Sequence, residues 1–187
     1  MTPDDQRRLA WKIYGSSPIY ESKWIRLELV DVEPPHGQRF QHHVARLGRI
    51  SIALVVDDMD RVLSLWRYRF ATSDWGYELL GGLVEEGEQP EETARREVQE
   101  ESGYQPVGEP TRLVSFQPLP GMVDAPIDVF LFRGAERIGE PTDAEEAGRI
   151  EWKPVDELLD LALRGELLGS GTLVPVLLYL AIRDRRK

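Results

Sequence analysis

Short apolar segments recur along the chain and are separated by charged or turn-forming residues. The longest run with strand character, ISIALVV at residues 50–56, is typical of a central strand buried on both faces. Residues 112–118, 127–133 and 149–153 show the β-branched and aromatic enrichment of further strands. These patterns predict a domain built around a sheet.

The N-terminal part follows a different pattern, in which aromatic and β-branched residues mix with charged ones. Residues 18–32 predict a half-buried strand, residues 33–39 (EPPHGQR) a turn, and residues 40–47 a returning strand. We therefore expect residues 1–47 to form an N-terminal strand and hairpin extension, and residues 48–187 to form the main domain.

A further strand is predicted at residues 61–70, RVLSLWRYRF. Because side chains alternate along a strand, Arg67 and Arg69 share one face, and Trp66 and Tyr68 the other. The two arginines form either a solvated face or a phosphate-binding pair, since guanidinium groups match phosphate oxygens.

The residues between this strand and residue 104 contain most of the candidate metal-binding side chains. Pro90 predicts the first turn of a helix, and Gly103 predicts its end. Within that helix Glu97, Glu100 and Glu101 are spaced i, i+3, i+4, so their carboxylates share one face.

Apolar Ala94 and Val98 lie beside that face and indicate that the carboxylates border the core. Like charges on one turn repel, and a divalent cation such as Mg²⁺ converts that repulsion into binding. Arg96 lies one helical turn from both Glu92 and Glu100 and can orient one of them. The alternative is a solvated acidic surface helix.

Two more helices are predicted towards the C-terminus. One begins at Pro154 and ends at Gly165. The second is capped by Thr172, has Pro175 in its first turn, and ends in arginines that complement the helix dipole.

Composition narrows the function classes. The net charge of −10 argues against nucleic acid as a partner, and the absence of cysteine excludes disulfides and thiolate zinc sites. His42 and His43 are strand neighbours that point to opposite faces, which favours ordinary hairpin side chains over a metal site. With no apolar leader and no apolar run long enough to span a bilayer, the chain is expected to be cytoplasmic, without membrane contact.

The segment GGLVEEGEQPEETARREVQEESGY, residues 81–104, resembles the signature box of the Nudix hydrolases. Tyr104 departs from the box, because that position is usually aliphatic. The other matching positions are Gly82, Glu88, Arg96, Glu97, Val98, Glu100, Glu101 and Gly103.

The resemblance implies an α/β fold, the Nudix α/β/α sandwich with a mixed sheet. It also implies hydrolysis of a nucleoside diphosphate linked to another moiety, with Mg²⁺, or alternatively Mn²⁺, as cofactor. The implied metal ligands are the Gly81 carbonyl and the carboxylates of Glu97, Glu100 and Glu101. Gly82, Glu88 and Arg96 would hold the loop and helix in place.

Around the box, the chain is similar to the ADP-ribose and ADP-sugar pyrophosphatase branch. That likeness implies substrate-binding roles for Arg69, Glu78, Pro118 and Pro120. The branch usually has Pro-Ala before the box glycine, where this chain has Leu80-Gly81. Substrates other than ADP-ribose stay open: NADH, coenzyme A, dinucleoside polyphosphates and nucleoside triphosphates.

In that branch a loop glutamate ahead of a Trp-x-Pro strand serves as general base or metal ligand. Counting back from Trp152 selects Glu146, with Glu145 as the adjacent alternative and Glu100 the next residue to consider. A solvated acidic loop is the competing interpretation.

The branch also implies a homodimer in which the N-terminal strands cross a two-fold axis. Two other classes of protein compete with a diphosphate hydrolase as interpretations of this sequence. A Nudix-fold sensing module would be expected to lose box carboxylates, which are retained here. An isoprenoid diphosphate isomerase would use a catalytic cysteine, which this chain lacks.

Overall fold

The computed structural model describes residues 1–143 and 148–185 and divides into two compact units. The smaller unit comprises Met1–Gly48 and Leu119–Ala125, and the larger comprises Arg49–Pro118 and Pro126–Lys187. In the described part of the chain, no helix is both long and apolar enough to cross a membrane.

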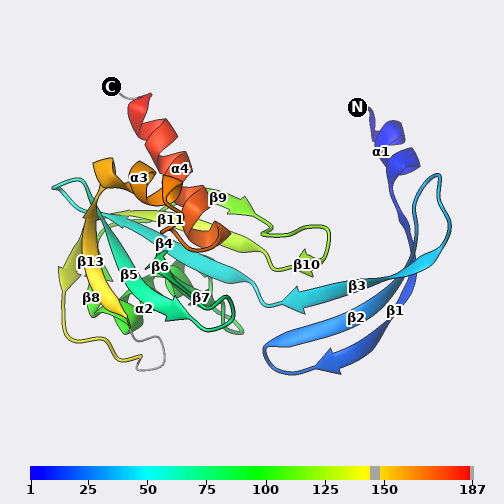
Figure 1. Cartoon of the computed structure of the whole chain (residues 1–187), viewed down its shortest axis with the longest axis horizontal. Coiled ribbons are helices and arrows are strands. Elements are labelled where there is room, and N and C mark those ends of the chain that lie inside the picture. Colours follow the sequence, from blue (N-terminus) through cyan, green and yellow to red (C-terminus); the bar gives the residue numbers. More distant parts are fainter. Residues whose placement is uncertain (144–147, 186–187) are drawn as a thin grey trace. The chain divides into compact units, whose positions relative to one another are not determined.

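The smaller unit is an antiparallel meander with one short parallel strand at its edge, in the order β1-β2-β3-β10 (Figure 1). The predicted hairpin is present as β2 and β3, and a helix and a strand precede it. The elements are α1 (Pro3–Leu9), β1 (Lys12–Glu21), β2 (Ile25–Glu33), β3 (Phe40–Leu47) and β10 (Val123–Asp124).

The single strand predicted for residues 18–32 is wrong, because the chain turns between β1 and β2. The Ser22 hydroxyl accepts hydrogen bonds from the amides of Trp24 and Ile25, and the Ser22 amide donates to the Ile25 carbonyl at 2.9 Å. This local side-chain bonding reverses the chain without glycine or proline.

The larger unit contains a seven-stranded mixed sheet, in which β4 and β11 run parallel and the other neighbours antiparallel. Its main path is β13-β5-β4-β11-β9, with β6 paired to β5 and β7 paired to β4. The strands are β4 (Ile50–Val56), β5 (Arg61–Arg69), β6 (Asp74–Glu78), β7 (Leu80–Leu83), β9 (Thr111–Phe116), β11 (Ile127–Arg133) and β13 (Arg149–Pro154).

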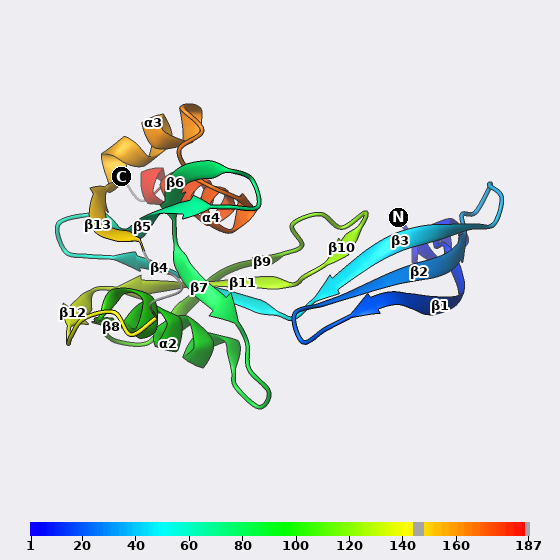
Figure 2. The ribbon, with the colours of Figure 1, turned by 60° about the horizontal axis from the view of Figure 1, so that its bottom comes forward.

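Helices cover both faces of this sheet (Figure 2). Along β4, Ala53 and Val55 face α2, whereas Ile52, Leu54 and Val56 face α3 and α4, as strand alternation requires. The helices are α2 (Pro90–Ser102), α3 (Leu158–Leu163) and α4 (Ser170–Asp184), with a 3₁₀ turn η1 (Val155–Glu157) before α3. The predicted α/β class and mixed sheet are confirmed.

Two features near the ends of these helices differ from the prediction. A short pair of strands, β8 (Tyr104–Pro106) and β12 (Ala135–Arg137), forms outside the strands predicted from the sequence. Helix α4 begins at Ser170, so Thr172 lies in its first turn and Pro175 in its interior. The Thr172 hydroxyl is therefore available for a contact outside its own helix.

Candidate active site

The site is built on β7, a short strand with a Gly-Gly pair between β6 and the loop before α2. Gly81 and Gly82 lie on β7, opposite Ile52 and Ser51 of β4. A Cβ on Gly81 would collide with the Ser51 backbone, and a Cβ on Gly82 would collide with the Glu97 carboxylate. The backbone contact requires glycine at position 81, and the missing Cβ of Gly82 lets the Glu97 carboxylate lie directly against the strand.

Helix α2 begins and ends as its sequence predicts. Pro90 is its first residue, and the Glu92 carboxylate accepts a hydrogen bond from the Gln89 amide at 3.0 Å. Gly103 has a φ of 71° and ends the helix by donating its amide to the Gln99 carbonyl.

Arg96 gathers three carboxylates of the box. Its Nε lies 3.0 Å from Glu88 Oε1, and its terminal nitrogen lies 2.9 Å from Glu97 Oε1 and 2.8 Å from Glu100 Oε2. The Arg96 hydrogen bond is the largest cause that lowers the pKa of Glu88 to about 2. Arg96 therefore ties the glycine-to-helix loop, where Glu88 lies, to the carboxylate face of α2.

The pKa of Glu97 is shifted in the opposite direction from that of Glu88. Burial raises the pKa of its carboxyl above the ordinary value, although the charge of Arg96 partly opposes that effect. A buried carboxylate with a raised pKa gains stability from a nearby positive charge.

A second arginine, Arg67 on β5, lies in the buried part of the site and is only 4% exposed. Its Nε is 2.6 Å from Glu78 Oε2, and its NH1 is 3.1 Å from Glu101 Oε1. Glu101 in turn accepts the amide of Gly81 at 2.9 Å. Arg67 thus links Glu78 of β6 to the most buried carboxylate of the box.

Arg69, the arginine selected from the sequence, lies two residues further along the same face and is also bonded to Glu78. Burial acts to raise the pKa of Glu78, but the Arg69 hydrogen bond and the charges of Arg67 and Arg69 together lower it below the ordinary value. Glu78 is therefore held as a carboxylate between two arginines.

Strand alternation contained a signal that pointed to Arg67. Leu63 and Leu65 of β5 pack in the cluster beneath α2. The next residue on that face is Arg67, and Arg69 follows at the end of the strand. A charged residue that continues an apolar face lies deeper than the one after it.

Four further site residues predicted from the sequence are Pro118, Pro120, Glu145 and Glu146. Pro118 ends a segment of the larger unit, whereas Pro120 belongs to the smaller unit. The proposed base Glu146 and its alternative Glu145 lie outside the described residues. For these four positions the assigned roles stay predictions.

The donor chemistry fits a hard divalent cation. Glu97 lies against Gly82, Glu101 accepts the Gly81 amide, and Glu100 shares Arg96 with Glu97; Mg²⁺ prefers such carboxylate oxygens. Among residues 1–143 and 148–185, no three His, Asp or Glu side chains are close enough together to hold one ion. In the described arrangement the three carboxylates are engaged by Arg67 and Arg96.

A wide depression of about 1090 Å³ lies along α2, and Arg96 and Glu100 contribute to its wall. Its other basic residues are already engaged: Arg95 donates to the carbonyls of Pro106 and Gly108, and Arg49 and Arg112 pair with buried Asp128. The depression is therefore open to solvent beside the box, and the arginines named here are already paired with protein groups and not directed at an anion.

Residues 46–169 match the NUDIX domain family. Over 179 residues the chain is 37% identical to a CMP-5'-(N-acetyl-N-hydroxy-3-aminopropyl)phosphonate hydrolase of Streptomyces rubellomurinus, covering 96% of this chain and 86% of that protein. It is 28% identical over 180 residues to an ADP-ribose pyrophosphatase of Bacillus subtilis, covering 95% and 96%.

A crystal structure of an ADP compounds hydrolase superposes with a TM-score of 0.81 at 18% identity, covering 94% of this chain and 95% of the other. That likeness concerns the fold. The sequence matches agree with the family predicted from the spacing of the box residues, and the chain belongs to the NUDIX domain family of hydrolases.

Proposed function

We propose that this protein hydrolyses the diphosphate bond of a nucleoside diphosphate linked to another moiety, with ADP-ribose or another ADP-sugar as substrate and AMP and a sugar phosphate as products. The observation that supports this most is the contact of two box carboxylates with the glycine pair, Glu97 at Gly82 and Glu101 at Gly81, beside the Arg67–Glu78 pair. Relatives named ADP-ribose pyrophosphatase support the substrate class.

In this proposal Glu97, Glu100 and Glu101 hold Mg²⁺ together with the Gly81 carbonyl. A bound divalent cation supplies charge neutralisation for the diphosphate and lowers the pKa of a water molecule. Arg69, which is partly exposed, contacts a phosphate, and Glu146 accepts the proton of the attacking water. Glu88 and Arg96 keep the helix and the loop in register, as their ion pair indicates.

Activity should require Mg²⁺ or Mn²⁺. Carboxylate and carbonyl oxygens favour hard cations over zinc, and Arg96 and Arg67 cannot neutralise a diphosphate while they are paired with glutamates. Turnover should vanish after dialysis against a chelator and return when Mg²⁺ is added. Full turnover after exhaustive chelation would contradict the metal assignment.

Glu146→Gln should lower kcat by about 10²–10⁴-fold with little change in KM, the cost of losing a general base. Glu145→Gln is the matched control and should have a mild effect, because a solvated loop charge contributes little. Both rates should be measured at saturating Mg²⁺, so that weaker metal binding is not mistaken for lost proton transfer. The reverse ranking would assign the base to Glu145, and two mild variants would move the test to Glu100.

A second candidate substrate is a cytidine monophosphate linked to a phosphonate, because a relative at 37% identity is named as a hydrolase of such a compound. In both candidates a nucleoside monophosphate is linked to a second phosphorus-containing group. The same carboxylates and cation can therefore serve either one.

The deciding experiment is a hydrolysis panel with Mg²⁺ at equal substrate concentrations, scored by kcat/KM. It should contain ADP-ribose, other nucleotide sugars, a CMP-linked phosphonate, NADH, coenzyme A, a dinucleoside polyphosphate and nucleoside triphosphates. The proposal expects the highest kcat/KM for ADP-ribose or an ADP-sugar. A clear preference for the CMP-linked phosphonate would replace it with the second candidate, and no hydrolysis of any compound would indicate a sensing module.

We also propose that the protein is a homodimer whose N-terminal strands contribute to substrate binding. Every residue of β1 is exposed, and the exposed apolar side chains of the smaller unit include Ile13 at 73%, Tyr20 at 58% and Trp24 at 60%. Exposed large apolar side chains in this number favour an interaction surface on the smaller unit.

Tyr20→Glu should therefore convert a dimer to a monomer in sedimentation velocity experiments and raise KM. Point substitution is preferable to deleting residues 1–47, since β10 pairs with β3 and would lose its partner. Glu21→Gln, on the same strand, is the control that should leave the dimer intact. A wild-type monomer at micromolar concentration would rule the dimer out.

A further inference from the structure

The chain changes its sheet partner at one residue beside the box. Strand β6 pairs with β5 and β7 pairs with β4, and Leu79 lies between them in neither strand. Its backbone amide donates instead to the hydroxyl of Thr172 in α4, at 3.1 Å. Leu79 is 5% and Thr172 is 4% exposed, so this bond is shielded from water.

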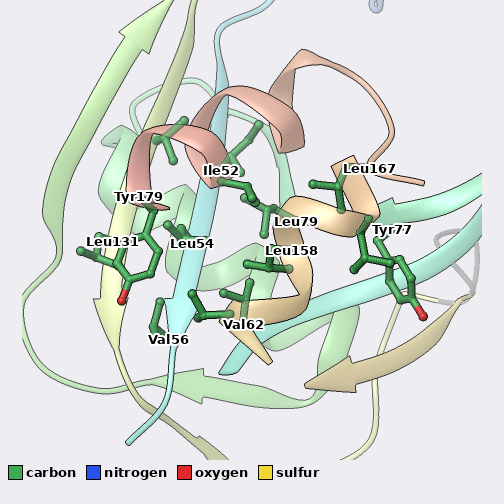
Figure 3. Packing of buried hydrophobic residues seen from close by; sticks show 14 of the residues in the cluster. Ile52, Leu54, Val56, Val62, Tyr77, Leu79, Leu131, Leu158, Leu167 and Tyr179 are labelled. Atoms are coloured by element: carbon green, nitrogen blue, oxygen red, sulfur yellow. The ribbon is translucent and has the colours of Figure 1, made fainter. Parts of the chain in front are cut away.

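The change of sheet partner at Leu79 is here termed the crossing. Residues 166–172, here termed the clamp segment, form hydrogen bonds with the backbone of Tyr77 and Leu79 at this crossing. The Tyr77 amide donates to the Glu166 carbonyl at 2.7 Å, and the Leu168 amide donates to the Tyr77 carbonyl at 2.9 Å. Figure 3 shows Leu167 beside Tyr77 and close to Leu79 in the buried cluster. Within the clamp segment, the Thr172 hydroxyl accepts the hydrogen bond from the Leu79 amide.

The first turn of α4 is itself fixed to the sheet. A Cβ on Gly171 would lie 2.7 Å from the Cδ1 of Ile52, so the helix backbone packs directly on β4. Ile52 is the residue that pairs with Gly81. Gly171, the neighbour of Thr172, therefore contacts β4, the strand that pairs with Gly81 of β7.

Glu78, directly before Leu79, and Gly81, two residues after it, both belong to the site. Glu78 bonds to Arg67, Arg67 bonds to Glu101, and Glu101 accepts the amide of Gly81. These contacts form a ring that closes through the backbone from Glu78 to Gly81, and Leu79 is in that backbone. A shift of Leu79 thus moves Glu78 and Gly81 together, and with them the buried carboxylate of Glu101.

From this arrangement we infer that Thr172 is a positioning residue of the active site. It acts through the Leu79 amide to set the spacing between Glu78 and Gly81, and it touches neither substrate nor cation. The kinetic part of this inference rests on the proposed function, whereas the part that concerns the Leu79 amide does not.

The test compares two variants that differ in the hydrogen-bond acceptor. Thr172→Val keeps the shape of the side chain and removes the acceptor, which leaves a buried amide without its bond. Thr172→Ser keeps the hydroxyl and loses a methyl group. Amide hydrogen exchange of Leu79 and Gly81 should be measured by NMR in the metal-free protein, and kcat and KM on the best substrate of the panel at saturating Mg²⁺.

Thr172→Val should speed exchange of the Leu79 amide about tenfold or more, as expected for a lost buried bond. It should lower kcat by roughly 10-fold to 100-fold with a smaller change in KM, because a site misplaced by about 1 Å loses that much rate. Thr172→Ser should match the wild type in both measurements, and the circular dichroism of all three proteins should agree. If Thr172→Val does not fold, Thr172→Ala removes the same acceptor and takes its place.

Wild-type exchange at Leu79 in the valine variant would overturn the inference, because the hydroxyl would not be holding the amide. Fast exchange with unchanged kcat would also overturn it, since Thr172 would then serve the fold alone. If the wild type hydrolyses no compound of the panel, the proposed function fails, and the exchange rates alone still decide whether Thr172 fixes the crossing at Leu79.

Discussion

Replacing Glu101 by glutamine should lower kcat by about 10²–10³-fold, the range seen when one group that stabilises developing charge is removed. Glu101 is 3% exposed and carries the only charge of the box that faces Arg67 in the described part of the chain. A glutamine oxygen can still accept the Gly81 amide, but its NH₂ group would face the Arg67 guanidinium. The variant should therefore lose affinity for Mg²⁺ and also some stability.

The two effects can be separated by measurement. The Mg²⁺ concentration for half-maximal activity should rise, and the melting temperature should fall by only a few degrees, as roughly 1–2 kcal/mol predicts for a chain of this size. Glu136→Gln, an exposed carboxylate on β12, is the control for loss of one charge and should behave as the wild type. A Glu101→Gln variant with wild-type kcat would show that the box is structural in this protein.

Helix α2 and its carboxylate face could be predicted from the sequence because their determinants are local. Pro90 and Gly103 fix the ends through backbone geometry, and the i, i+3, i+4 spacing fixes the shared face without reference to the rest of the fold. Strand β4 could also be predicted from the sequence, because a continuous apolar run of this length is typical of a strand buried on both faces.

Features that depend on distant partners could not be predicted in this way. The strand pattern indicates that Arg67 lies deeper than Arg69, but it does not state that Arg67 bonds to both Glu78 of β6 and Glu101 of α2. The contact between Thr172 and Leu79 joins residues 93 positions apart in sequence. Thr172 resembles a helix N-cap by composition, and only the tertiary structure shows that α4 starts earlier, after Gly169 with its φ of 68°.

The turn at Ser22 illustrates a third kind of difference. The residues from β1 through β2 carry the same mixture of aromatic and charged side chains, so composition does not mark the reversal. A single serine hydroxyl that accepts two backbone amides is sufficient to make it.

Arg67→Met should cause the largest loss of stability among the site variants. Arg67 and Glu101 form an ion pair whose side chains are 4% and 1% exposed, and Glu78 at 14% is the second partner. Methionine fills similar volume but leaves two carboxylates without this positive charge. Removing one partner of a buried pair costs about 3–5 kcal/mol, because the remaining charge is desolvated and uncompensated.

Arg69→Met is the matched control, because Arg69 shares the partner Glu78 but is 41% exposed. Exposed pairs contribute about 0–1 kcal/mol, so its urea midpoint should stay close to that of the wild type. If Arg69 contacts a phosphate, that variant should instead raise KM. Equal stability loss in the two variants would show that Glu78, which both arginines bind, carries the effect. A stable, fully active Arg67→Met protein would mean that Glu101 is held by Gly81 alone, and the ring that connects Glu78 to the box would have no energetic role.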